Sequence, residues 1–72
     1  MAPPTGQETV SLLRWLRRQL RQPTPQRERL EAAVANDDPG EARRIVGTLP
    51  FGDAQRAHVL GLIDGWEASR ER

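Results

Sequence analysis

Three interruptions that contain proline divide the chain into four stretches, each about the length of one helix. They lie near residues 22–25, 36–40 and 50–53. Proline fixes φ and removes a backbone donor, so it ends a helix or opens the next one. None of the stretches alternates apolar and polar residues with the period of a strand. The chain is therefore predicted to be all-α, as a small four-helix bundle or an orthogonal helical array without strands.

Capping residues set the expected boundaries. Threonine and aspartate side chains accept hydrogen bonds from the free N–H groups of a first helical turn, and they precede each stretch here. The expected N-caps are Thr5, Thr24, Asp38 and Asp53. Glu8 and Glu41 follow two of them at the spacing of a capping box. The 72 residues are predicted to form a single domain, 1–72, with a disordered lead-in at 1–4 and helices at about 6–22, 25–35, 39–48 and 54–69.

The small size of the chain limits how it can be stabilised. Domains below about 70–80 residues usually need a disulfide, a metal, a partner chain or very good helix packing. The sequence has no cysteine and one histidine, so neither a disulfide nor a metal site is expected, and no cofactor is implied. Helix packing and association with another chain remain as the expected sources of stability. Phe51, in the last interruption, is expected to turn inward from its loop.

The first predicted helix has an uneven surface. At about 100° per residue its leucines gather on one side, and Trp15 lies at their edge. Arginines follow the 0, 3, 4, 7 spacing on nearly the opposite side, and no acidic residue interrupts them. The proposed binding residues on this helix are Arg14, Trp15, Arg17, Arg18 and Arg21.

This arginine row has two interpretations. It is either the solvated side of an amphipathic helix or a recognition face for an anionic partner. Four like charges without interspersed carboxylates favour recognition, although Glu28 and Glu31 of the next helix could neutralise part of the row. A net charge of +1 and only three aromatic residues argue against a dedicated nucleic-acid domain. A protein partner with an acidic surface is preferred, and nucleic-acid phosphates are the alternative.

The last predicted helix carries a row of small residues beside its apolar face. Two glycines inside a helix cost about 1 kcal/mol each relative to alanine, and close approach of another backbone could recover that cost. The partner would be the first helix or a second copy of the chain, so a homodimer is possible. The predicted helix-packing or self-association seam consists of Ala57, Gly61, Gly65 and Trp66.

Catalytic chemistry is not expected. No spacing brings a serine or threonine together with His58, and no phosphate-cradling glycine loop occurs. No apolar run approaches a membrane span, and the N-terminus lacks the pattern of a secretory signal, so a cytoplasmic location is expected. The use of arginine without lysine is typical of a GC-rich bacterial genome. The sequence thus predicts a non-enzymatic protein–protein interaction module, such as an adaptor, a docking subunit or an inhibitor of a larger complex.

Overall fold

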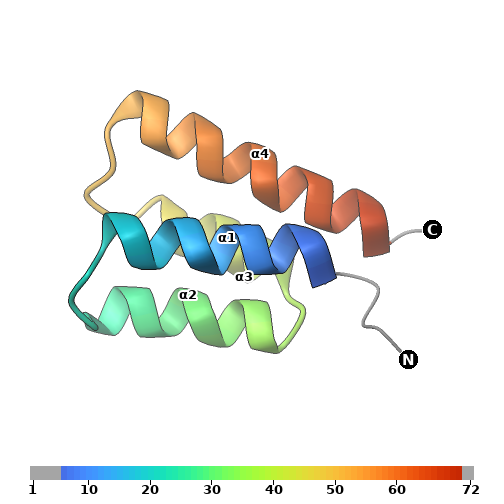
Figure 1. Ribbon diagram of the computed structural model, residues 1–72, viewed down its shortest axis with the longest axis horizontal. Helices are drawn as coiled ribbons and strands as arrows, with labels where there is room; N and C mark the ends of the chain where they lie inside the picture. The colour runs from blue at the N-terminus through green and yellow to red at the C-terminus, as the bar shows by residue number, and fades with distance from the viewer. Residues whose placement is uncertain (1–5, 71–72) are drawn as a thin grey trace.

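The fold consists of four helices, as the computed structural model of residues 6–70 shows (Figure 1). No strand occurs among these residues, so the all-α prediction is confirmed. The expected lead-in at 1–4 and the expected N-cap Thr5 lie outside the described residues, and side chains are described from Glu8 onward. The helices are α1 (Gly6–Gln19), α2 (Pro25–Ala35), α3 (Pro39–Val46) and α4 (Asp53–Arg70).

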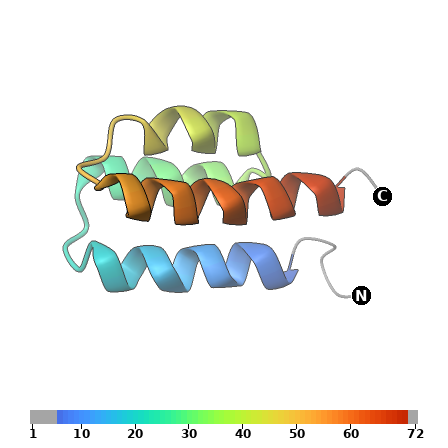
Figure 2. The same cartoon turned by 90° about the horizontal axis from the view of Figure 1, so that it is seen from above.

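Consecutive helices run in opposite directions, as Figures 1 and 2 both show. α1 packs against α2 and α4, and α3 packs against the same two helices from the other side. The four helices therefore form a ring in which the last helix returns to the first. Of the two predicted architectures, the bundle is the one that forms.

Two of the predicted caps form as expected, and one does not. Thr24 Oγ1 accepts a hydrogen bond from the backbone N–H of Arg27 at 3.2 Å, and Asp38 Oδ1 accepts one from the N–H of Glu41 at 3.1 Å. The prediction of Asp53 as a cap is wrong. Gly52 is the capping residue of α4, because its carbonyl accepts the first helical bond and its N–H donates to Gln55 Oε1 at 2.9 Å.

The first helix ends three residues earlier than predicted, at Gln19 rather than Gln22. The Arg27 guanidinium binds the backbone just beyond this end. Its Nη1 donates to the carbonyls of Leu20 at 2.8 Å and Arg21 at 3.1 Å. Carbonyls at a helix C-terminus have no partner within the helix, and a cation is favourable there. Arg21 therefore follows the helix instead of continuing its arginine row. α3 likewise ends at Val46, two residues before the predicted end.

All four helices and the loop before α4 contribute to the core. Trp66 is the largest side chain that is fully buried, and Phe51 turns inward from the loop as predicted, with 7% of its surface exposed. The remaining core side chains are Leu12, Leu16, Leu30, Ala33, Val34, Ala42, Ile45, Val46, Leu49, Val59 and Ile63. The leucine side of α1 is thus buried, as its periodicity indicated.

The link between α2 and α3 is tied to the far end of α4. Asp37 has a φ of +56°, and the N–H groups of Asp37 and Asp38 donate to the carbonyls of Val34 and Ala33. This pattern is a Schellman motif, in which glycine usually takes the left-handed position. Here the Asp37 carboxylate accepts hydrogen bonds from Trp66 Nε1 at 2.7 Å and from Arg70 Nε at 2.9 Å.

The hydrogen bonds that carboxylates accept in this fold should make its stability depend on pH. Hydrogen bonds from Trp66 and Arg70 hold the pKa of Asp37 below its ordinary value of 3.8. The Arg43 guanidinium, which donates to Glu67 Oε1 at 2.6 Å, holds the pKa of Glu67 below 4.5. Because these pKa values are lower in the folded chain, the unfolded chain takes up protons first as the pH falls.

The stabilisation is therefore complete above about pH 4.5 and disappears as the pH falls through the folded pKa values. Urea titrations from neutral to acid pH should show the free energy of unfolding declining across this window. Glu67→Gln should make the decline shallower. An unchanged slope in that variant would show that Glu67 contributes nothing to the acid sensitivity.

A second prediction concerns Gly61, which lies exposed in the middle of α4. No heavy atom lies within 4 Å of the position that a Cβ would occupy there. Gly61→Ala should therefore raise the free energy of unfolding by about 1 kcal/mol, the difference between the two residues in an exposed helix. Urea unfolding measures the change, and a loss of stability would contradict the open environment described here.

Candidate functional site on the outer side of α1

The arginines of α1 point away from the core. Arg14, Arg17 and Arg18 are exposed, and together we call them the α1 basic face. Arg21 is also exposed, but it lies in the link after the helix. Among the described residues no carboxylate lies within ion-pair distance of Arg14 or Arg18. The basic face thus keeps two uncompensated guanidinium groups.

Arg17 is partly compensated by the next helix. Its Nε lies 3.4 Å from Glu31 Oε2, and the Nε of Arg27 lies 3.2 Å from the same oxygen. The Arg17 side chain is still 61% exposed, and an ion pair in such a position contributes little to stability. Glu31 therefore neutralises one edge of the basic face, as the sequence suggested, whereas Glu28 forms no ion pair within residues 6–70.

A hollow of about 340 Å³ lies along α1 itself. Its walls are Val10, Leu13, Arg14 and Arg17. Val10 is 49% exposed and is the large apolar side chain most open to solvent in the described part of the chain. Apolar surface thus interrupts the basic face between two of its arginines.

A second hollow, of about 280 Å³, separates α1 from α4. We call it the α1–α4 groove, and it is lined by Ser11, Arg14, Trp15, Arg18, His58 and Leu62. Leu62 and Trp15 are half-buried, whereas Arg14 and Arg18 are exposed. The groove therefore combines apolar side chains with the two uncompensated arginines.

Trp15 is held in place from two sides. Its ring packs edge-on against Phe51, with 5.2 Å between the ring centroids and 62° between the planes. The imidazole of His58 lies on another side, at 5.3 Å and 40°. Edge-to-face aromatic pairs are favourable beyond the area they bury. Trp15 is thus a fixed, partly exposed aromatic group beside the arginines.

The four residues of the predicted seam on α4 do not lie on one common surface. Trp66 is fully buried, and Gly65 faces α1, where an added Cβ would lie 3.5 Å from Glu8 Cγ. Ala57 and Gly61 are exposed, so an internal packing role is wrong for these two residues. Self-association through them stays a prediction, which light scattering at two protein concentrations would test.

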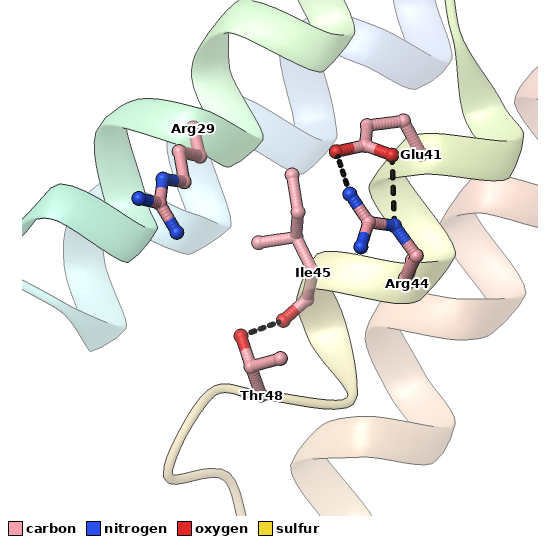
Figure 3. Close-up of a pocket in the computed structure, with 5 residues that line it drawn as sticks. All are labelled: Arg29, Glu41, Arg44, Ile45 and Thr48. Atoms are coloured by element: carbon pink, nitrogen blue, oxygen red, sulfur yellow. Dashed lines mark hydrogen bonds and ion pairs between the residues drawn. The ribbon is translucent and has the colours of Figure 1, made fainter.

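A smaller hollow, of about 70 Å³, lies between α2 and α3 (Figure 3). Arg44 donates to Glu41 from Nε at 2.9 Å and from Nη2 at 2.6 Å, and this pairing lowers the pKa of Glu41. Glu41 is therefore turned toward Arg44 instead of completing the predicted capping box. Arg29 projects from α2 on the other side and makes no hydrogen bond or ion pair with the four other residues drawn. The charges of α3 at this hollow are thus paired locally.

The arginines and Trp15 were predicted from the sequence, whereas Val10, Leu62 and His58 were not among the predicted binding residues. Val10 could have been found, because helical periodicity places it among the arginines and away from the leucines. Leu62 and His58 come to the site only through the packing of α4 on α1.

Within residues 6–70 no group of three histidine, cysteine or carboxylate side chains is placed to hold a metal ion. None of the four helices combines the length and the hydropathy of a membrane-spanning segment. Comparisons of the chain with protein-family models, curated proteins and solved structures found no match.

Proposed function

We propose that this protein is a non-enzymatic interaction module that binds an acidic surface of another protein through the α1 basic face. An adaptor, a docking subunit or an inhibitor of a larger complex would use such a face. One observation carries the proposal. Two arginines without an ion-pair partner among the described residues, Arg14 and Arg18, lie beside exposed apolar surface.

This combination suits a protein partner. Arginine, tryptophan and apolar side chains are enriched where protein surfaces bind one another. Guanidinium groups match carboxylates in a bidentate geometry. A nucleic-acid domain usually carries a strong positive charge and several aromatic groups for stacking, whereas this chain has a net charge of +1 and one partly exposed aromatic residue beside its arginines.

Charge reversal tests the proposal. The full chain is immobilised and used to capture a partner from an extract of its native source, as wild type and as Arg14→Glu, Arg18→Glu and the double variant. We expect each single reversal to weaken capture about tenfold and the double variant to abolish it, because like charges then face each other across the interface. The helical circular dichroism signal should be retained.

Arg29→Glu is the matched control, since Arg29 is exposed on α2 and forms no ion pair within the described residues. It should capture the partner like wild type. A labelled DNA duplex, titrated at two salt concentrations, distinguishes the alternative. Duplex binding that weakens with salt and is lost in the Arg14→Glu/Arg18→Glu variant would replace the acidic protein by nucleic acid.

A further inference from the structure

The α1–α4 groove is bounded by two antiparallel helices along successive turns. Ser11, Arg14, Trp15 and Arg18 follow one another at the three- and four-residue spacing of one side of α1, and His58 and Leu62 repeat one turn apart on α4. The lining therefore covers two turns of α1 and one turn of α4. Its arginines lie on the α1 side, and Leu62 with the imidazole of His58 lies on the α4 side.

The two helical walls of the groove restrict which secondary structure of a partner protein can bind there. The described residues contain no strand, so the partner cannot extend a sheet edge there. A groove between two neighbouring helices accepts the side chains of a third helix, whose apolar stripe lies in the groove while its flanks remain polar. Complementarity to Arg14 and Arg18 requires carboxylates on the flank that lies over α1.

We infer that the α1–α4 groove binds an acidic amphipathic helix of the partner protein. An apolar side chain of that helix packs against Trp15 and Leu62, and its carboxylates pair with Arg14 and Arg18. The inference rests on the proposed function and adds to it the groove, the helical form of the partner and the apolar anchor.

The α1–α4 groove is a better binding site for such a helix than the neighbouring hollow at Val10. That hollow has walls from α1 alone, whereas the groove has walls from two helices and an aromatic ring fixed by Phe51 and His58. Fixed aromatic side chains give up little conformational freedom on binding, which makes them favourable anchors.

Trp15 also provides a signal for the experiment. Trp66 is fully buried and Trp15 is only half-buried, so a ligand in the groove removes water from Trp15 alone. The tryptophan emission should shift to shorter wavelength when the groove is filled.

The probe is a synthetic peptide with leucines at positions i, i+3, i+4 and i+7 and glutamates on the remaining faces. Its control has the same composition with the leucines dispersed, so that no apolar stripe forms. Both are titrated against the full chain and followed by tryptophan emission and calorimetry. We expect the amphipathic peptide to bind at least about tenfold more tightly and to shift the emission, because only in this peptide do the leucines lie on one side of the helix and face the groove together.

Leu62→Ala should weaken binding of the amphipathic peptide about tenfold. Leu60→Ala is the matched control, because Leu60 is also a half-buried leucine of α4 packed on the core but does not line the groove. Val10→Ser tests the neighbouring hollow. Both control variants should bind the peptide as wild type does, and thermal unfolding establishes that every variant is folded at the assay temperature.

Three results would overturn the inference. Equal affinity for the two peptides would show that charge alone is recognised, and the proposed function would then stand without the helical anchor. Loss of binding in Val10→Ser but not in Leu62→Ala would move the partner to the other hollow. Binding of neither peptide would reject an acidic amphipathic helix, while the capture experiment with Arg14 and Arg18 would decide the proposed function separately.

Discussion

Trp66→Ala is expected to leave most of the chain unfolded at physiological temperature. Trp66 is completely buried and is the largest side chain in the core, and its indole donates to Asp37. Truncation of a buried aromatic residue to alanine costs about 3–5 kcal/mol. Native domains are typically stable by only about 5–15 kcal/mol, and small ones bury the smallest fraction of their surface. The loss is therefore comparable with the whole stability of a domain of this size.

Circular dichroism and urea unfolding measure this effect. Trp66→Phe is the informative comparison, because it keeps an apolar ring in the core but removes the donor to the carboxylate of Asp37. We expect this variant to fold and to unfold at a urea concentration between those of wild type and the alanine variant. A folded alanine variant with an unchanged urea midpoint would contradict the central place of Trp66 in the core.

Phe51→Ala is the second large expected effect. Phe51 is 7% exposed and fills the core from the loop before α4, so its truncation should also cost about 3–5 kcal/mol. It also packs against Trp15, and its loss leaves one side of that ring without its aromatic partner. The variant should therefore be less stable and, where it is still folded, should have a more solvent-exposed Trp15.

Urea unfolding reports the first part of this prediction, and quenching of tryptophan emission by iodide at low temperature reports the second. Phe51→Leu should recover most of the buried apolar surface without the edge-to-face contact. Its stability should lie closer to wild type, whereas its Trp15 should stay more accessible to quenching than in wild type. Equal quenching in all three proteins would show that Phe51 does not position Trp15.

Local rules were sufficient for much of this fold. The cap at Thr24, the cap at Asp38 and the buried leucine side of α1 depend on residues within one or two turns, and all three were predictable from the sequence. The inward turn of Phe51 was predictable as well, because a large apolar residue in a short loop has few other ways to avoid water.

Long-range packing determined what the sequence did not reveal. The carbonyls just after α1, those of Leu20 and Arg21, accept hydrogen bonds from the guanidinium of Arg27 in the next helix. Asp37 occupies a position typical of glycine, and its carboxylate accepts hydrogen bonds from Trp66 and Arg70, which lie 29 and 33 residues further along the chain. The groove beside Arg14 likewise exists only because α4 returns to α1. The first of these contacts crosses the turn between two helices, and the other two features need side chains that are distant in sequence, so the period of a single helix contains none of them.

The ring arrangement of the helices affects the stability of the fold. Three of its four helix–helix interfaces join neighbours in the sequence, and the fourth, between α1 and α4, joins the two ends of the described chain. Bringing such distant segments together carries the largest loop-closure entropy. A ligand that binds across this junction should stabilise the closed ring, and the free energy of unfolding should rise with the logarithm of the ligand concentration once that concentration exceeds the Kd.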